Sequence, residues 1–433
     1  MNAGLSAGDT AWVLLCSALV LLMTVGLALF YGGLVRPKNA LNTMMMSVIA
    51  LGLVGVQWVV AGYSLTFHSG GGWLGGFGWV GLHGVGLTPD PTYAATIPHQ
   101  AHAAFQGMFA IITPALISGA IVVRSYAVFL VLWATLVYDP LAHWVWGADG
   151  WLFKRGALDF AGGTVVHISA GVSALVAAWM LGPRKDFRRV PLAPHNVPIV
   201  LLGAGLLWFD WFGFNAGSAL AANGLATLAF VNTNTAAATA LVTWALLDLS
   251  RGGRITAVGA ATGLVVGLVG ITPAAGYVTP LAALVIGVVA AGISYTAIQI
   301  RSASRLDDAL DVFSCHGLAG ATGALLTGVF ATKLVNPAGA NGLLAGNAAQ
   351  LGVQLLAVVA AAAFAAAGTA VILKLLQVTI GARAGVSEEL AGLDLSEHGE
   401  EAYFGTDLGS LAGPGSALGG SVIVHAREPA TVT

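Results

Sequence analysis

Long apolar stretches separated by short polar segments run along the chain from near its start to about residue 380. A stretch of about 17 to 25 apolar residues is long enough for a helix to cross the hydrocarbon core of a bilayer. Roughly eleven stretches reach this length. They lie near residues 9–31, 44–67, 99–121, 125–146, 162–181, 198–218, 227–248, 256–273, 278–298, 311–331 and 348–378. The pattern therefore predicts an all-α, polytopic membrane protein with eleven transmembrane helices.

The composition agrees with a membrane environment. Hydrophobic residues make up 57% of the chain and charged residues 8%, whereas soluble domains carry about 25% charged residues. The net charge of -2 provides no basic surface for nucleic acid, so no nucleic-acid partner is expected. Cys16 and Cys315 fall inside apolar stretches and are expected to be small buried side chains.

The distribution of Lys and Arg predicts the orientation, because these residues accumulate in cytoplasmic loops. One set of loops, together with the tail, carries most of them, and the other set carries only Lys154, Arg155 and Lys333. The larger set is Arg36, Lys38, Arg124, Arg184, Lys185, Arg188, Arg189, Arg251, Arg254, Arg301, Arg305, Lys374, Arg383 and Arg427. With an odd number of spans, the N-terminus is expected outside and the C-terminus inside, in a multi-pass protein of the cell membrane.

The first ten spans divide into two halves of five that meet in the basic loop 183–198. Because five is odd, the halves have opposite orientations, as in the inverted repeats of transport proteins. The eleventh span has about thirty residues and is expected to tilt across the bundle. The predicted regions are repeat one at 1–190, repeat two at 191–335, helix 11 at 336–380, and a cytoplasmic regulatory tail at 381–433 that is disordered after about residue 408.

Two histidines at membrane depth are the most informative polar residues. His167 follows Asp159 by eight residues, and His316 follows Asp308 by eight residues. Eight helical residues rise about 12 Å, so aspartates at opposite edges of a core about 30 Å thick place the imidazoles within about 6 Å of each other in depth. We therefore expect the two histidines to meet near the midplane. Neither is expected to contact its own aspartate, because eight residues also turn the helix by about 80°.

A buried histidine pair can be a proton relay, a metal site, the polar lining of a narrow pore, or a hydrogen-bonded packing pair. A metal site needs further ligands, and these spans hold no cysteine, glutamate or third histidine at useful spacing. Matching positions in two inverted halves argue against packing alone. The sequence therefore favours a pore lining.

Asp159 and a group of aromatic residues mark the outer end of the predicted bundle. Asp159 precedes a helix, so its carboxylate is expected to cap backbone N–H groups, and a fixed negative charge there also favours a cation. Aromatic residues at this depth usually form a lipid belt, but a few that face a pore mouth would bind a cation through their π faces. The candidates are Phe105, Phe109, Trp144, Trp146 and Trp151, with Ser218 as a hydrogen-bond acceptor.

Other polar residues in the spans receive structural interpretations. His99 and His102 have no third metal ligand in view and are expected to form an exposed pair in a vestibule. The segment 232–235 is expected to hydrogen-bond neighbouring helices. Asp139 and Asp210 are expected to be buried in neutral form, or paired across helices or subunits.

Six motifs resemble those of the ammonium transporters of the Amt/Mep/Rh type, and the Amt branch most closely. They extend over about residues 10 to 407, from the first span to the tail. The motifs are Leu29–Arg36, Ala104–Gly107, Gly156–His167, Trp211–Ser218, Asp311–Gly317 and His398–Tyr403. The resemblance implies an eleven-helix protomer that assembles as a homotrimer with one pore in each subunit.

The resemblance also implies roles for individual residues. The tail resembles the region at which a PII-type signalling protein docks and blocks the pore. Trp146, Phe105, Ser218 and Asp159 correspond to an outer recruitment site for ammonium, Phe109 and Phe214 to a phenyl gate, and His167 and His316 to a twin-histidine pore lining.

Together these observations predict a transporter of ammonium, with methylammonium as an analogue. NH4+ would be recruited at the outer site and deprotonated, and NH3 would pass the histidines with or without separate proton transfer. The alternative is an ammonium sensor or signalling scaffold on the same fold, and the short tail without a catalytic domain counts against it. No enzyme activity, cofactor or metal is expected.

Overall fold

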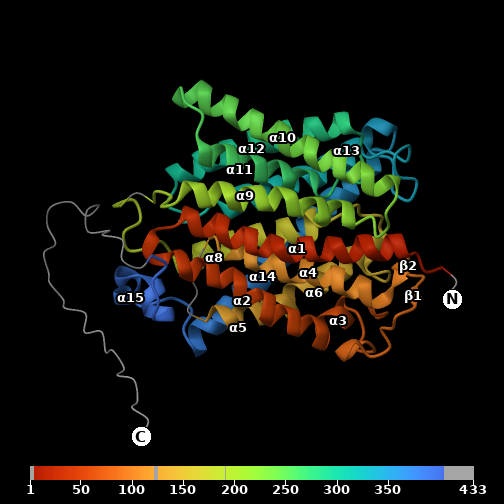
Figure 1. Cartoon of the computed structure of the whole chain (residues 1–433), viewed down its shortest axis with the longest axis horizontal. Coiled ribbons are helices and arrows are strands. Elements are labelled where there is room, and N and C mark those ends of the chain that lie inside the picture. Colours follow the sequence, from red (N-terminus) through yellow and green to blue (C-terminus); the bar gives the residue numbers. More distant parts are fainter. Residues whose placement is uncertain (1–3, 121–124, 191, 404–433) are drawn as a thin grey trace, which may run out of the picture.

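The computed structural model describes residues 4–120, 125–190 and 192–403, and most of this length is helical (Figure 1). The helices lie side by side. A short hairpin of β1 (Pro89–Asp90) and β2 (Ala94–Pro98) lies at one end of the bundle, and α15 (Val386–Ala391) lies at the other; we call these the hairpin end and the α15 end. The other helices are α1 (Ala7–Leu34), α2 (Ala40–Gln57), α3 (Tyr63–Phe67), α4 (His99–Ile117), α5 (Tyr126–Trp133), α6 (Asp139–Trp146), α7 (Trp151–Lys154), α8 (Ser169–Leu181), α9 (Val197–Trp211), α10 (Gly224–Gly252), α11 (Ala257–Ile271), α12 (Pro280–Ala303), α13 (Ala319–Phe330) and α14 (Ala348–Thr379).

Nine segments within the described residues are long and apolar enough to cross a membrane. Some are composite, such as Pro37–Phe67, in which α2 continues into α3. The helix α11 is apolar but shorter, and α4 packs against both α1 and α2. The described residues are mostly helical and include nine candidate membrane spans, so the predicted helical membrane architecture is confirmed at this level, whereas the count of eleven spans stays a prediction.

Five spans contain a short π-helical segment, in which each backbone N–H bonds the carbonyl oxygen five residues earlier instead of four. The apolar pattern does not predict these segments, because hydrophobicity does not reveal whether a backbone N–H bonds the carbonyl oxygen four or five residues earlier. Such π-turns are frequent at functional sites, and two of them carry the paired histidines. The segments are Trp58–Gly62, Ala134–Tyr138, Gly163–Ile168, Phe212–Ala216 and Phe313–Leu318.

Small residues and amide side chains hold the helices together. A Cβ at Gly33 would lie 2.8 Å from the carbonyl oxygen of Asn196, so α1 and the start of α9 touch through their backbones. The Asn232 side chain on α10 donates to the carbonyl oxygens of Ala275 and Val278, both at 2.8 Å. The predicted bonding of segment 232–235 to neighbouring structure is therefore confirmed at this residue.

His99 and His102 differ from their prediction, because they are 5% and 1% exposed rather than an exposed pair. His102 Nδ1 lies 3.0 Å from the Tyr63 hydroxyl, and its ring stacks on Tyr93 with centroids 5.4 Å apart. The segment 68–98 folds over the start of α4 and covers both histidines with aromatic side chains. The prediction was wrong because the apolar pattern of α4 does not reveal which loop packs on its end.

Residues 381–403 pack onto the α15 end of the bundle. The Asp394 carboxylate accepts hydrogen bonds from the backbone N–H groups of Leu41 and Asn42 at the start of α2, at 3.0 and 2.8 Å. Burial raises the pKa of this carboxyl above its ordinary value, and the two N–H donors oppose that rise. The predicted disorder after about residue 408 lies outside the described residues.

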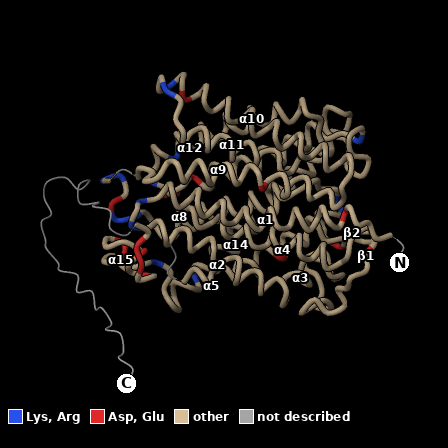
Figure 2. The backbone as a smooth tube through the Cα atoms, viewed as in Figure 1, with Lys and Arg blue, Asp and Glu red and all other residues tan. Residues whose placement is uncertain are grey.

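Charged side chains are distributed unevenly between the two ends. Figure 2 shows Lys and Arg gathered mainly at the α15 end, as the two predicted sets of loops require. Several are paired there: Arg184 lies 2.7 Å from Asp307, and Arg301 lies 2.7 Å from Asp311. The middle of the bundle carries few charged groups (Figure 2), and the aspartates that lie there are considered with the site.

Candidate functional site

His167 and His316 lie in contact inside the bundle, as predicted. Their Nδ1 atoms are 3.3 Å apart, their ring centroids are 5.3 Å apart, and the residues are 1% and 4% exposed. His167 belongs to the π-helical segment that precedes α8, and His316 to the one that precedes α13. A Cβ at Gly171 would collide with the backbone of Gly317. These two glycines let the helices cross closely enough for the imidazoles to meet.

A series of aromatic rings leads from His167 towards the hairpin end. Phe214 lies beside His167, with ring centroids 6.1 Å apart, and stacks on Phe109 at 4.2 Å with an angle of 22°. Phe109 contacts Phe105 at 5.0 Å and the edge of Trp146 at 6.0 Å. Phe105 and Phe109 are fully buried in the bundle, so the lipid-belt interpretation is wrong for these two residues.

The remaining aromatic candidates belong to a different cluster. Trp144 packs against Trp73 and Trp151, with centroids 5.2 and 5.6 Å away, and against Phe364 of α14 at 4.5 Å. Its indole N–H donates to the carbonyl oxygen of Trp73 at 2.8 Å. Trp144 and Trp151 therefore attach loop and helix segments to one another.

A cavity of about 310 Å³ opens at the hairpin end of the aromatic series. Trp146, Ser218 and Asp159 contribute to its wall, together with His102 and Tyr93. The Ser218 hydroxyl donates to the carbonyl oxygen of Phe214 at 2.9 Å, which leaves its lone pairs free to accept a hydrogen bond. Three of the predicted recruitment residues thus share one cavity, whereas Phe105 is fully buried, is not part of the cavity wall, and contacts Phe109.

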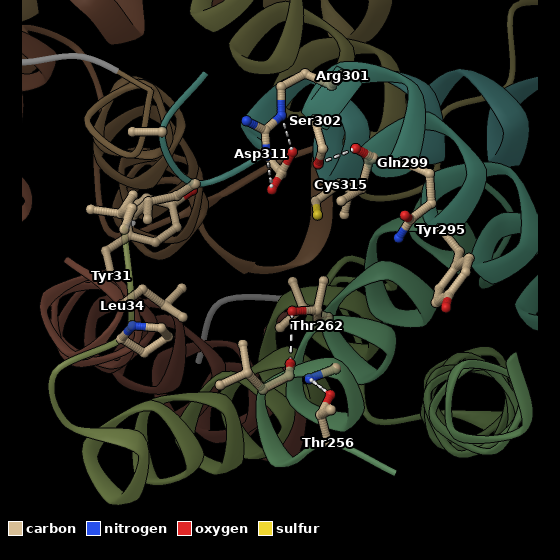
Figure 3. Close-up of a pocket in the computed structure, with 18 of the residues that line it drawn as sticks. Tyr31, Leu34, Thr256, Thr262, Tyr295, Gln299, Arg301, Ser302, Asp311 and Cys315 are labelled. Atoms are coloured by element: carbon tan, nitrogen blue, oxygen red, sulfur yellow. Dashed lines mark hydrogen bonds and ion pairs between the residues drawn. The ribbon is translucent and has the colours of Figure 1, made fainter. Parts of the chain in front are cut away.

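A larger cavity of about 660 Å³ opens at the α15 end and reaches His316. Figure 3 shows Cys315, Tyr31 and the ion pair between Arg301 and Asp311 on its walls. Between the two cavities lie Trp146, Phe109, Phe214, His167 and His316, each in contact with the next. One continuous series of side chains therefore connects a cavity at one end of the bundle with a cavity at the other.

Asp159 fixes the geometry at the hairpin end of this series. Its two carboxylate oxygens accept four backbone N–H groups, from Gly162, Gly163, Thr164 and Val165, at 2.9, 2.6, 2.8 and 3.1 Å. Its own carbonyl oxygen accepts the indole N–H of Trp146 at 2.9 Å. The predicted cap is confirmed, and the same residue positions both the Trp146 ring and the start of the segment that carries His167.

Asp308 has the corresponding position before His316. Its carboxylate accepts the backbone N–H groups of Val312 and Phe313 at 3.1 and 2.9 Å. Both aspartates therefore bond to the backbone at the start of a π-helical segment rather than to an imidazole, as the helix geometry predicted.

Trp211 contacts the site but was given no separate role from the sequence. Its ring stacks on His167 with centroids 5.4 Å apart and an angle of 24°, and its indole N–H donates to the Thr272 hydroxyl at 2.9 Å. It lies three residues before Phe214 on the same helical run, which is the spacing of neighbours on one helix face. That spacing was the available signal.

Asp139 and Asp210 have different surroundings. The Asp139 carboxylate accepts the side-chain N–H of Gln57 at 2.7 Å, so this residue is paired across helices, one of the two expected states. Asp210 is fully buried, and neither carboxylate oxygen has a hydrogen-bond partner among the described residues.

Comparison with known proteins shows which protein family this sequence matches. Residues 11–403 match the family model described as the Ammonium Transporter Family. The chain is 48% identical over 401 residues to an ammonium transporter of Bacillus subtilis, which covers 92% of this chain and 98% of that protein. The crystal structure of Saccharomyces cerevisiae Mep2 superposes with a TM-score of 0.84 at 38% identity, over 89% of each chain. A solved structure titled "Sensor Amt Protein" superposes with a TM-score of 0.83 at 29% identity, over 90% of this chain and 98% of that one.

The helix crossing at Gly171 can be tested by a single methyl group. Gly171→Ala forces the helices of the two histidines apart, and such overpacking costs about 1 to 3 kcal/mol. We expect a lower midpoint of thermal unfolding in detergent for this variant than for the wild type. The matched control is Gly205→Ala in α9, where a Cβ meets nothing within 4 Å. Equal midpoints for the two variants would contradict a tight crossing.

Proposed function

The chain belongs to the ammonium transporter family, and on that premise we propose that it recruits NH4+ at the hairpin end and conducts NH3 past the two histidines. One proton of NH4+ passes to water in the hairpin-end cavity, and NH3 crosses with or without separate transfer of that proton. The observation that carries this proposal is the continuous series from Trp146 through Phe109, Phe214 and His167 to His316. It joins two cavities that open at opposite ends of a membrane-spanning bundle.

Recruitment uses the cavity at the hairpin end. A cation over the face of Trp146 gains about 0.5 to 2 kcal/mol, and the free lone pairs of Ser218 accept one of its hydrogen bonds. Phe105 belongs to the predicted recruitment site but lies buried against Phe109. Asp159 adds negative charge nearby and holds Trp146 in place through its carbonyl oxygen. This interaction is strong enough to concentrate NH4+ but too weak to replace its whole hydration shell.

The stacked rings of Phe109 and Phe214 form the gate in this proposal. Their centroids are 4.2 Å apart and both residues are fully buried, so a solute must displace at least one ring to pass. Removing an ion from water costs several kcal/mol even after the protein relaxes. Loss of the proton at the gate removes that cost, because neutral ammonia needs no counter-charge.

The histidine pair then receives the neutral molecule. A hydrogen bond between two Nδ1 atoms contains one proton, so one ring donates and the other accepts. The donating ring therefore presents an Nε2 lone pair, and the accepting ring presents an Nε2–H. His167 Nε2 has no partner among the described residues. The pair can thus offer ammonia both an acceptor and a donor while both rings remain neutral.

The arrangement in the membrane follows the same proposal. Eleven spans result if α4 and α11 cross together with the nine longer segments. The excess of Lys and Arg at the α15 end supports an N-terminus outside and a C-terminus inside, in two inverted repeats (1–190 and 191–335) followed by the long last helix. Assembly as a homotrimer rests on the family resemblance, as does docking of a PII-type protein on the tail that begins near residue 381.

The alternative function is an ammonium sensor built on the same fold. The structure titled as a sensor shares this fold at 29% identity, whereas relatives at up to 48% identity are named ammonium transporters. Transport rather than catalysis is the activity that these names indicate.

Uptake of labelled methylammonium into liposomes separates transport from sensing. We expect uptake well above that of protein-free liposomes. Trp146→Leu removes the best π face and should raise the half-saturating concentration by about two- to thirtyfold, the equivalent of a cation-π contact. Uptake no greater than in empty liposomes, from protein that remains folded, would reject the transport function.

The double variant His167→Ala with His316→Ala tests the pore lining. It removes the only imidazoles that contact each other in the pore series and should abolish selective or charge-coupled transport, measured as ammonium-driven current in supported membranes. His83→Ala is a suitable control because His83 is exposed and lies away from the series. Currents unchanged in size and selectivity would reject the assigned role.

A further inference from the structure

His143 on α6 has an environment that the transport mechanism does not use. It lies three residues before Trp146 and is 0% exposed. Its Nδ1 lies 2.7 Å from the carbonyl oxygen of Thr66, and its Nε2 lies 2.7 Å from the carbonyl oxygen of Gly71. Both ring nitrogens therefore face backbone oxygens at full hydrogen-bond distance.

Proton counting restricts the state of this ring. A carbonyl oxygen only accepts hydrogen bonds, and a neutral imidazole carries one N–H. The second nitrogen would then direct a lone pair at another lone pair across 2.7 Å. Rotating the ring by 180° places C–H groups opposite the oxygens, although such contacts normally lie at about 3.3 to 3.6 Å. Only the doubly protonated ring fits both distances.

The other histidines with two ring contacts do not have this restriction. His195 bonds a carbonyl oxygen through Nδ1 and the Tyr403 hydroxyl through Nε2, and a hydroxyl can donate as well as accept. The paired histidines of the pore share one proton between two nitrogens. Among the described residues, His143 is the histidine whose two nitrogens both face groups that can only accept.

We propose that His143 is a buried imidazolium cation, and that its second proton ties the segment 66–73 to the helix that carries Trp146. The proton is thus a bound ligand at a site separate from the ammonium pathway. Without this proton, one of the two carbonyl groups would have no donor and would face a nitrogen lone pair. His143 acts as a positioning residue, because it contacts neither cavity nor pore ring.

Three further hydrogen bonds attach segment 66–73 to residues that follow His143 in the chain. The Trp144 indole bonds the Trp73 carbonyl oxygen, the Trp151 N–H bonds the Gly72 carbonyl oxygen at 3.1 Å, and the Gly70 N–H bonds the Asp149 carboxylate at 3.3 Å. Gly147 follows on the same helix, and a Cβ there would lie 2.6 Å from His143 Nδ1. The imidazole therefore fills a tightly bounded space. The hydrogen-bonded segment 66–73, which we call the strap, lies across it.

Two carboxylates lie near His143 along the chain. Asp139 lies one turn earlier on the same helix, and Asp149 follows the helix and bonds Lys154 at 3.0 Å. Neither carboxylate bonds the ring, whose hydrogen bonds go to the two carbonyl groups. The remaining groups on the packed elements are His68 of the strap, Tyr63 of α3, Tyr138 before α6, Lys154 of α7, and Asp159 and His167 at the start of the α8 span.

Nitrogen NMR of histidine-labelled protein in lipid tests the charge directly, without a transport assay. The signal of His143 is assigned by its loss in His143→Asn, with His143→Gln as a second variant if the first does not fold. At neutral pH we expect both ring nitrogens of His143 to carry a proton. A non-protonated ring nitrogen at neutral pH would overturn the proposal.

Hydrogen exchange at one fixed pH, compared between the wild type and a folded His143 variant, tests how the ring holds segment 66–73. We expect protection of the Gly70 and Trp151 amides to fall about tenfold or more in the variant, because a hydrogen bond from a charged donor is lost. The amides of Gly342 and Asn347, bonded within another loop of the hairpin end, correct for intrinsic exchange. Unchanged relative protection in the folded variant would overturn the positioning role of His143. His83→Asn, at an exposed histidine of the same end, should leave both measurements unchanged.

Discussion

Polar groups inside an apolar bundle have little water to bond, so each must find its partners within the protein. This requirement organises the structure. The Asp159 carboxylate receives four backbone N–H groups, and Asp308 receives two. Asp139 receives the amide of Gln57, and His143 bonds two carbonyl groups. Asp210 is an exception, because neither of its carboxylate oxygens has a partner among the described residues. The Nε2 of His167 is also unpartnered, and its place in the series between the two cavities is the reason we propose that a passing solute bonds there.

Steric constraints act together with these bonds. The two π-helical segments are fixed at their starts by aspartates and cross where Gly171 meets Gly317. Because both are anchored, their histidines meet without a bond to either aspartate. The carbonyl oxygen of Asp159 also holds Trp146, so one residue sets both the entrance of the ring series and the depth of the histidine pair. The proposed recruitment, gating and lining thus depend on a small number of backbone contacts.

The sequence was sufficient for the positions of the spans and for the meeting of His167 and His316, because apolar length and helical rise determine both. It was insufficient where loop packing or helical register decides. The covering of His99 and His102 depends on segment 68–98, which has no periodic pattern. The π-helical segments depend on single hydrogen-bond shifts that composition does not record. The contact of Trp211 with His167 and the two carbonyl partners of His143 required coordinates, since neither follows from spacing alone.

If ammonium enters through the cavity at the hairpin end, blocking that cavity must stop uptake. The direct measurement uses Ser218→Cys in a background of Cys16→Ser and Cys315→Ser, treated from the hairpin side with a bulky, membrane-impermeant thiol reagent. Labelled methylammonium uptake is compared before and after labelling, with the unmodified double-serine background as the control. The predicted result is loss of uptake in proportion to the labelled fraction. Full labelling of Cys at position 218 with undiminished uptake would contradict the path from Trp146 to His316.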